Sequence, residues 1–319
     1  MIWLIGAGQM AIDYANVLLA QKREFLVIGR GENSAKVFKE KTGISVKTGS
    51  LAKWLSQTPE KPTEVIVAVN VNMLAETTSL LLNYGVRKIL LEKPGGLDNK
   101  EISELNNQTV ELNGEIYIAY NRRFYASTLT AQELIMNDGG VNSFNFEFTE
   151  WSHVIENIGY PNEVMQQWFL VNSSHVVNLA FFLGGQPKSW STYTSGSLPW
   201  HSNASNFSGA GVTEFGALFS YQANWEAPGR WGVEILTCKH RLYFRPMEEL
   251  QIQEKGTIKV NPVEIDYTLD TEYKPGLYLQ TECFFELGKH KNNLCSIAEH
   301  FNALETYNKI LNPSTENVH

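Results

Sequence analysis

The chain has 319 residues, of which 43% are hydrophobic and 19% charged, and its formal net charge at pH 7 is −8. This composition is ordinary for a globular protein, and the length is sufficient for two domains with a buried core. A negative charge without any lysine- or arginine-rich block excludes nucleic acid and membranes as expected partners. No apolar run reaches the roughly 18 residues of a membrane span. No basic region precedes the apolar N-terminus, so a signal peptide is not expected and we predict a cytoplasmic protein.

Strands and helices alternate through the first 119 residues. Residues 2–8, 25–31, 64–70 and 88–94 are apolar runs of strand length, rich in Val, Ile and Leu. Segments with helical spacing lie between them, and glycines suited to helix C-caps end two of these segments, Gly43 and Gly85. Strands that lack in-out alternation and take turns with helices imply a parallel sheet covered on both faces. The sequence therefore predicts a doubly wound, Rossmann-like domain over residues 1–119.

The turn between the first strand and the first helix carries a nucleotide-binding pattern. Gly6, Gly8 and Ala11 form G-x-G-x-x-A, with Gln9 and Met10 at the start of the helix. The first glycine allows the tight turn, the second lets a pyrophosphate approach the backbone, and the small third residue permits close helix–strand packing. The free N–H groups and dipole of the helix would then hold the phosphates. A purely structural turn is the alternative, and the strand-turn-helix context favours dinucleotide binding.

The second strand indicates which dinucleotide is bound. NAD sites place an acidic residue at its end, to hold the ribose 2′-hydroxyl. Here Gly29 and Arg30 follow the strand, and an arginine pairs with a 2′-phosphate. Ser34 and Lys36 are placed to assist. We therefore predict NADP(H) rather than NAD(H), with a solvated loop arginine as the alternative.

After residue 120 the pattern changes from helical alternation to strands with one buried face. Phe144, Phe146 and Phe148 alternate with polar residues, and the same period of two recurs over residues 215–225 and 231–244. A large, mostly antiparallel open sheet is therefore predicted in an α/β domain over residues 120–319. A closing helix at about 294–311 is expected to pack back near the domain junction, followed by a frayed tail at 312–319.

A helix that is apolar almost all round is predicted from 168 to 185. Asn172, His175 and Asn178 lie three residues apart in it and form a polar seam. Buried polar groups need partners, so the seam is expected to face a site or a hydrogen-bonded core. The helix itself is expected to pack on the antiparallel sheet.

The chain resembles the Gfo/Idh/MocA oxidoreductase family over nearly its whole length. The resemblance is carried by the glycine motif, by EKP at Glu92 to Pro94, by YNRRF at Tyr120 to Phe124, by the seam helix and by the closing segment TECFFELGKHKN with its last helix. It implies a Rossmann domain followed by an α/β domain whose open sheet builds homodimers or homotetramers. It also implies hydride transfer between NAD(P) and a carbinol or carbonyl carbon of a sugar, cyclitol or nucleotide-sugar.

The resemblance assigns the site residues by position. Lys93 and His175 fall on the catalytic lysine and histidine of the family. The predicted cofactor-binding residues are Gly6, Gly8, Gln9, Met10, Arg30, Ser34, Asn70, Glu92 and Lys93. The predicted substrate-binding residues are Asn121, Arg123, Asn172 and Asn178, with a structural salt bridge as the alternative for Arg123. The aromatic residues that could stack on a sugar, although core positions are the more common use, are Trp151, Tyr160, Trp168 and Trp200.

The sequence departs from the family pattern at two aspartate positions. Val171 and Asn178 stand where family members commonly carry aspartates, and Val69-Asn70 replaces the usual Thr-Pro after the fourth strand. The retained Lys93 and His175 favour an oxidoreductase acting on a small sugar-like molecule, and Arg30 favours NADP(H) as its cofactor. The alternative is a sensor that binds NAD(P) without turnover, which the loss of the aspartates favours.

The three cysteines indicate neither a disulfide framework nor a zinc site. They are odd in number and widely spaced, and the chain contains no CxxC or HExxH motif. Cys238 and His240 could bind a metal as a pair, but alternation along a strand explains their spacing better. No metal is predicted.

Overall fold

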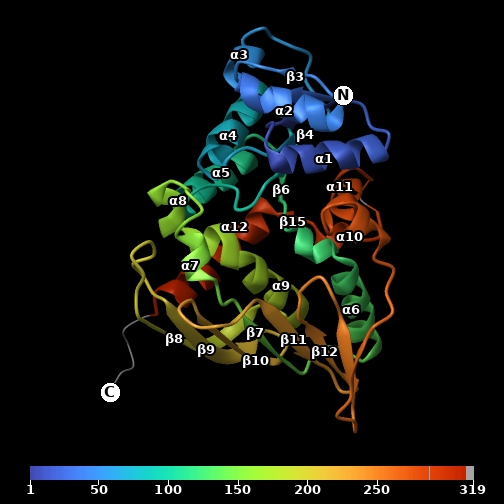
Figure 1. Ribbon diagram of the computed structural model, residues 1–319, viewed down its shortest axis with the longest axis vertical. Coiled ribbons are helices and arrows are strands. Elements are labelled where there is room, and N and C mark those ends of the chain that lie inside the picture. The colour runs from blue at the N-terminus through green and yellow to red at the C-terminus, as the bar shows by residue number, and fades with distance from the viewer. Residues whose placement is uncertain (287, 314–319) are drawn as a thin grey trace. The chain divides into compact units, whose positions relative to one another are not determined.

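The computed structural model describes residues 1–286 and 288–313 and divides the chain into two compact units (Figure 1). Unit 1 contains Met1–Phe124 and Thr268–Asn302, and unit 2 contains Tyr125–Tyr267 and the chain from Ala303 onward. The first break lies close to the predicted boundary at residue 120, whereas the return of Thr268–Asn302 to unit 1 was not expected. The nucleotide and substrate roles predicted for the two ranges stay predictions. Of the predicted tail at 312–319, residues 314–319 lie outside the described residues.

Unit 1 is built on a seven-stranded sheet with the order β15-β6-β5-β4-β1-β2-β3. Its strands are β1 (Ile2–Ile5), β2 (Phe25–Ile28), β3 (Val46–Lys47), β4 (Glu64–Val67), β5 (Lys88–Leu91), β6 (Glu115–Ile118) and β15 (Cys295–Ser296). All neighbours pair in parallel except β15, which runs antiparallel to β6. The predicted doubly wound parallel sheet is confirmed, and its carboxyl ends share one edge.

The helices of unit 1 cover this sheet with two apolar cores. They are α1 (Gln9–Ala20), α2 (Glu32–Thr42), α3 (Leu51–Leu55), α4 (Leu74–Tyr84), α5 (Asn99–Glu111), α10 (Thr268–Glu272) and α11 (Leu277–Glu286), with short 3-10 turns η1 (Val71–Met73), η2 (Asn121–Phe124) and η4 (Lys291–Asn293). One core contains Leu4 and the other Trp3, because neighbouring side chains of β1 point to opposite faces. The predicted glycine C-caps of α2 and α4 are confirmed by left-handed Gly43 and Gly85.

Helix α11 comes from the returning segment and packs along α1. Its residues Leu277 and Phe284 join the same core as Tyr14 and Leu18 of α1. The Nε2 group of Gln21 donates to a carbonyl of α11 at 3.0 Å. Figure 1 shows this segment in orange and red beside the dark blue α1. The nucleotide-type fold is thus completed by residues that are about 260 positions away in sequence.

Unit 2 is built on an eight-stranded sheet with the order β14-β13-β12-β11-β7-β10-β9-β8. Its strands are β7 (Ser143–Glu147), β8 (Pro187–Ser195), β9 (Asn206–Thr213), β10 (Leu218–Asn224), β11 (Gly232–Leu236), β12 (His240–Phe244), β13 (Gln251–Glu254) and β14 (Val260–Pro262). Only the β7–β10 pair is parallel among these described strands. The three segments with period-two patterning lie in this one sheet, so the predicted mostly antiparallel sheet is confirmed.

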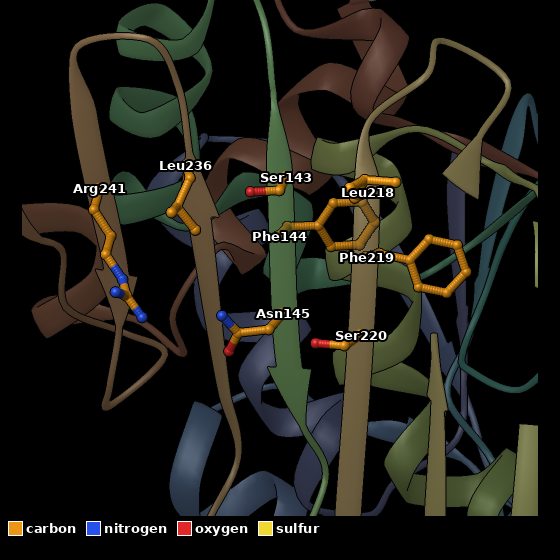
Figure 2. A pocket seen from close by; sticks show the side chains of 8 residues that line it. All are labelled: Ser143, Phe144, Asn145, Leu218, Phe219, Ser220, Leu236 and Arg241. Carbon is orange, nitrogen blue, oxygen red and sulfur yellow. The ribbon is translucent and has the colours of Figure 1, made fainter. Parts of the chain in front are cut away.

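The two faces of this sheet differ in polarity. Phe144, Phe146 and Phe219 point to a buried face, whereas Ser143 and Ser220 point to the other. A shallow hollow on the sheet is lined by residues of β7, β10, β11 and β12, including Ser143, Ser220 and Arg241 (Figure 2). The alternation explains why the strands carry an aromatic residue at every second position.

The helices of unit 2 include the predicted apolar helix, which packs on the buried face. They are α6 (Ala126–Asn137), α7 (Ser152–Ile155), α8 (Asn162–Gln166) and α9 (Ser174–Gly184), and the chain closes with α12 (Ile297–Leu311). The ring of Phe181 meets Phe144 and Phe219 edge-on, at centroid distances of 5.8 and 5.2 Å. A Cβ on Gly184 would lie 2.3 Å from the Phe144 ring, so a glycine is needed for this close packing. No helix among the described residues is both long and apolar enough to cross a bilayer.

Candidate functional site

The turn between β1 and α1 has the features that each position of the glycine motif requires. Gly6 has φ +125°, and a Cβ there would lie 2.1 Å from the carbonyl oxygen of Ala68. By contrast, a Cβ on Gly8 would meet no atom within 4 Å, and Gly8 is exposed. Ala11 is fully buried. Gly6 is therefore required by packing, whereas the backbone at Gly8 is open to an approaching group.

The first turn of α1 suits an anionic group. Its N-cap is Gly8, so no N-cap side chain occupies the N–H groups at this end of the helix, and the first turn contains no acidic residue. Two ammonium groups lie beside it: the Nζ of Lys41 donates to Oε1 of Gln9 at 3.1 Å, and the Nζ of Lys274 lies 2.8 Å from Sδ of Met10. The amide of Gln9 also donates to Asp13 at 2.8 Å. A dinucleotide pyrophosphate fits these features.

Arg30 is an exposed residue directly after β2, at the same edge of the sheet as Gly8. Its carbonyl oxygen accepts a hydrogen bond from the N–H of Gly49 at 3.3 Å, which ties the backbone to the next loop. The hydroxyl of Ser34 donates to the carbonyl of Gly31 at 3.0 Å, and Lys36 is exposed. Asn70 is exposed after β4 at this edge as well. The predicted contacts of these residues with a cofactor stay predictions.

A partly buried carboxyl group lies directly after β5. The hydroxyl of Tyr14 donates to Oε1 of Glu92 at 2.7 Å. Burial raises the pKa of Glu92, against the hydrogen bond from Tyr14 and the positive charges of Lys274 and Lys93. Lys93 itself is only 8% exposed. Parallel strands bring the ends of β1, β2, β4 and β5 to one edge, so unit 1 gathers most predicted cofactor residues there.

Two predicted substrate residues are engaged in contacts within unit 1. The Nδ2 of Asn121 donates to the carbonyl of Pro275 at 2.9 Å. Arg123 is 2% exposed and forms an ion pair with Glu299 at 2.7 Å. The structural salt bridge considered as the alternative for Arg123 is therefore present. A substrate contact of either residue stays a prediction.

His300 is a buried histidine of unit 1 that the sequence patterns did not single out. Its Nδ1 lies 3.2 Å from the hydroxyl of Tyr120. Burial lowers the pKa of His300 to about 3, so the ring is neutral at physiological pH. A hydrogen-bonded position in the core explains this residue.

The first residue of the polar seam, Asn172, contacts a buried glutamate of unit 2, Glu150. Asn172 donates through Nδ2 to both oxygens of Glu150, at 3.0 and 3.2 Å, and the hydroxyl of Ser173 donates at 2.7 Å. Glu150 is 1% exposed, and burial raises its pKa to about 7, against these two donors and the positive charge of Arg230. The sequence contained a signal for this residue, because Glu150 continues the inward phase of Phe144, Phe146 and Phe148.

The seam does not lie on one regular helix. A π-helical turn, η3 (Phe169–Ser173), precedes α9, so Asn172 lies in the wide turn and His175 in the first turn of α9. The His175 ring is partly buried, and its centroid is 6.4 Å from that of Trp231. Asn178 donates to the hydroxyl of Tyr307 at 3.4 Å. π-helical turns such as η3 occur frequently at functional sites.

Of the two predicted catalytic residues, Lys93 belongs to unit 1 and His175 belongs to unit 2.

The four aromatic candidates divide by exposure. Trp151 and Tyr160 are exposed by 46% and 51%, and the guanidinium of Arg230 lies over the Trp151 ring. Trp168 and Trp200 are buried, which is the core position weighed as their alternative. Only the first pair therefore has a face available for stacking.

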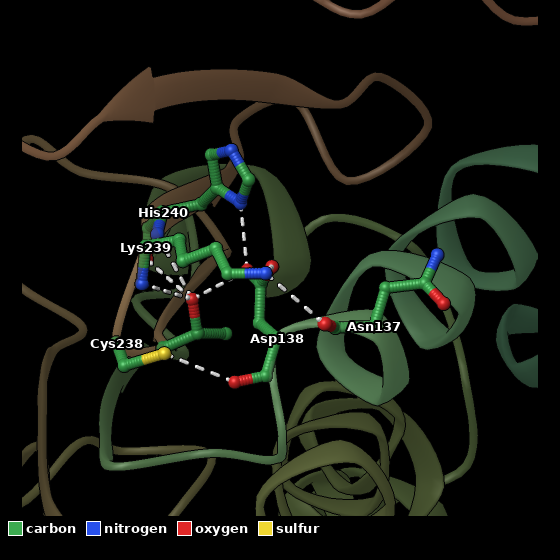
Figure 3. Close-up of polar contacts among 6 residues, drawn as sticks. Asn137, Asp138, Cys238, Lys239 and His240 are labelled. Atoms are coloured by element: carbon green, nitrogen blue, oxygen red, sulfur yellow. Dashed lines mark hydrogen bonds and ion pairs between the residues drawn. The ribbon is translucent and has the colours of Figure 1, made fainter.

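The pair Cys238 and His240 is engaged with one aspartate (Figure 3). The Sγ of Cys238 donates to the carbonyl of Asp138 at 3.0 Å, and Nδ1 of His240 lies 2.6 Å from its carboxylate. Within residues 1–286 and 288–313, no group of three His, Cys, Asp or Glu side chains could hold a metal ion. The contacts join the end of α6 to the β11–β12 turn.

Comparisons with known proteins agree with this architecture. Residues 1–92 match the sequence model of a family described as NADP oxidoreductase, coenzyme F420-dependent. A search of curated proteins gave no match. Among solved structures, UDP-N-acetylglucosamine 3-dehydrogenase GnnA from Acidithiobacillus ferrooxidans is 14% identical, with a TM-score of 0.73 over 97% of this chain and 95% of that one. A levoglucosan dehydrogenase in complex with NADH and L-sorbose is 17% identical, with a TM-score of 0.75 over the same shares.

A third similar structure is an oxidoreductase from Agrobacterium radiobacter in complex with NAD⁺, L-tartaric acid and magnesium. It is 13% identical, with a TM-score of 0.74 over 96% of this chain and 93% of that one. Because the matches cover both units, the two-unit fold that the resemblance predicted is confirmed.

Proposed function

We propose that this chain is an NADP(H)-dependent oxidoreductase that transfers a hydride to or from the carbonyl or hydroxyl carbon of a sugar, cyclitol or nucleotide-sugar. The observation that carries the proposal is the open backbone at Gly8, on an α1 N-terminus that has no acidic residue in its first turn. This is the arrangement that a pyrophosphate requires. The match of residues 1–92 to an NADP oxidoreductase family supports it.

The proposed chemistry needs one proton in addition to the hydride. A bound nicotinamide dinucleotide supplies or accepts the hydride. Reduction of a ketone leaves an alkoxide, which must gain a proton, and oxidation must lose one. We assign this proton to His175, since histidine is the side chain that most often transfers protons in both directions near neutral pH. Lys93 would donate a hydrogen bond to the reacting oxygen and stabilise its developing charge.

The substrate class rests on the kinds of molecules that similar structures handle. UDP-N-acetylglucosamine, levoglucosan and L-sorbose all offer secondary hydroxyl or carbonyl carbons on a sugar frame. The seam residues carry two amides, Asn172 and Asn178, and one imidazole, His175, which suit hydrogen bonding to sugar hydroxyls. The complexes named above contain NADH and NAD⁺, so they do not support a preference for NADP(H). That preference rests on Arg30.

The test is a cofactor titration followed by a turnover assay. NADPH binding is measured by fluorescence, and NADPH oxidation is then followed with L-sorbose and other sugar ketones. NADP⁺ reduction is followed with levoglucosan, UDP-N-acetylglucosamine and inositols. Binding with steady turnover of any member supports the proposal, whereas an absence of dinucleotide binding would refute it.

The second candidate is a sensor that binds NAD(P) without turnover. Val171 and Asn178 stand where the family pattern has aspartates, and this loss favours a site without catalysis. The same assay separates the two candidates, because a sensor binds NADPH and leaves it unoxidised across the whole panel.

We also propose that the chain forms a homodimer or homotetramer through the polar face of the unit 2 sheet. The open face of a sheet is usually buried by another element or by a partner subunit. On this face Arg241 pairs with Glu234 beside a hollow. Light scattering that gives the mass of one chain at micromolar concentration would contradict this proposal.

A further inference from the structure

We propose that Lys274 is a further cofactor-binding residue, whose ammonium group contacts the pyrophosphate of the dinucleotide at the N-terminus of α1. The inference rests on the proposed function, because it adds a residue to the same nucleotide site. No nucleotide motif includes this lysine, since it lies in the segment that returns to unit 1 after the unit 2 sheet.

Two neighbours place the ammonium group at the cofactor edge of the sheet. Its Nζ lies 2.8 Å from Sδ of Met10, in the first turn of α1. Its charge also opposes the rise that burial causes in the pKa of Glu92, the residue directly after β5. The strands β1 and β5 end at the same edge, so Lys274 lies where the glycine turn and the EKP segment meet.

The hydrogen-bond acceptor of this ammonium group, the thioether of Met10, is a weak one. A thioether accepts hydrogen bonds poorly, whereas a phosphate oxygen forms a charge-assisted bond with a lysine. The first turn of α1 contains no acidic residue, and the side-chain oxygen of Asp13 in the next turn accepts from Gln9. An anion at Gly8 would therefore offer Lys274 a much better acceptor than Met10 does.

The backbone that carries Lys274 is held firmly within unit 1. The carbonyl of Pro275 accepts from Nδ2 of Asn121 at 2.9 Å, and the N–H of Gly276 donates to Asp270 at 2.7 Å. Immediately afterwards α11 begins, and its apolar side packs against α1. The lysine is exposed, yet its position beside α1 is fixed by the helix that follows it.

The proposal gives Lys274 a role that differs from that of Arg30. Arg30 would contact the 2′-phosphate, which only NADP(H) carries, whereas Lys274 would contact the pyrophosphate, which both dinucleotides carry. Lys274→Met should therefore weaken NADPH and NADH binding by the same factor, about 10-fold for one charge-assisted contact near the surface. Lys274→Arg keeps the charge and should keep most of the affinity.

The experiment is a fluorescence titration of the full chain with NADPH and with NADH, at low and at high salt. The matched control is Lys22→Met, which removes the same charge just beyond the other end of α1, roughly 18 Å away for a helix of this length. The difference between the unmodified chain and Lys274→Met should shrink at high salt, because exposed charges are screened.

The outcomes separate this inference from the proposed function. If the unmodified chain binds neither dinucleotide, both are wrong. If it binds them and Lys274→Met and Lys274→Gln bind them equally well, only the role of Lys274 is wrong. Loss of NADPH affinity alone would also overturn it, since that result assigns the lysine to the 2′-phosphate.

Discussion

Each unit has a carboxyl group beside a predicted site, partly buried in unit 1 and buried in unit 2, and the two groups have different surroundings. Glu92 in unit 1 accepts a hydrogen bond from Tyr14 and is close to two ammonium groups, those of Lys93 and Lys274. Glu150 in unit 2 accepts from the neutral side chains of Asn172 and Ser173, with the charge of Arg230 as a weaker influence. Burial raises the pKa of both carboxyl groups.

The difference lies in how each unit places a carboxyl group. Unit 1 matches the family pattern after β1, in the glycine motif, and after β5, in EKP, whereas Val69-Asn70 replaces the usual Thr-Pro after β4. In unit 2, Val171 and Asn178 stand where the family that the chain resembles commonly has aspartates, and the carboxyl group of Glu150, from the segment that follows β7, contacts the π-helical turn η3. Because Glu150 has neutral donors and little exposure, its charge should depend on pH near neutrality. The substitutions below test this contrast.

The largest effect is expected from the two proposed catalytic residues, one in each unit. His175→Ala should lower kcat by about 10²–10⁴-fold, the usual contribution of general acid–base catalysis, and leave NADPH affinity nearly unchanged. Lys93→Met should cost at least as much. Turnover is measured on any substrate found, with cofactor binding as the control. A His175→Ala variant that folds and keeps near-normal turnover would make the histidine a core residue.

Glu150→Gln should change the pH dependence of stability. The folded pKa of about 7 lies above the ordinary value of 4.5, so the folded chain holds a proton that the unfolded chain releases. The stabilising contribution is complete below pH 4.5 and is lost as pH rises through 7. Gln does not titrate, so from pH 5 to pH 8 the variant should gain about 3 kcal/mol relative to the unmodified chain. Urea unfolding at both pH values measures this. Parallel stability curves would mean that Glu150 does not titrate in this range.

Arg30→Ala should affect only the choice of cofactor. A guanidinium–phosphate pair contributes roughly 1.5–3 kcal/mol, so the unmodified chain should prefer NADPH over NADH by about 10- to 100-fold. The substitution should remove most of this preference and spare NADH binding. Lys39→Ala, an exposed lysine in the last turn of the neighbouring helix α2, is the control. Equal affinities of the unmodified chain for the two cofactors would end the NADP(H) prediction.

The smallest effect is expected from Tyr14→Phe, which removes the donor to Glu92. The loss of one hydrogen bond should lower the free energy of unfolding by about 1 kcal/mol. The loss is small because Lys93 and Lys274 remain near Glu92. Thermal unfolding measures it, with Tyr160→Phe at an exposed position as the control. A loss several times larger would show that the tyrosine, rather than the cations, maintains the carboxyl group.

The sequence by itself determined the parts of the fold that depend on local pattern. Unbroken apolar runs such as Leu4 to Ile5 and Val65 to Val67 require a sheet that is covered on both faces. The alternation of Phe144, Phe146 and Phe148 requires a sheet with one buried face. The glycine turn is local as well, because φ at Gly6 and the open space at Gly8 depend on a strand that enters a helix directly.

Only the tertiary structure decided which distant residues complete each site. The contact between Met10 and Lys274 spans 264 positions, and it exists because α11 returns to pack on α1. Glu150 meets Asn172 across 22 positions because the sheet and the π-helical turn pack together. Such contacts leave no period in the sequence, since they depend on how apolar faces pack and not on the spacing of residues along one element.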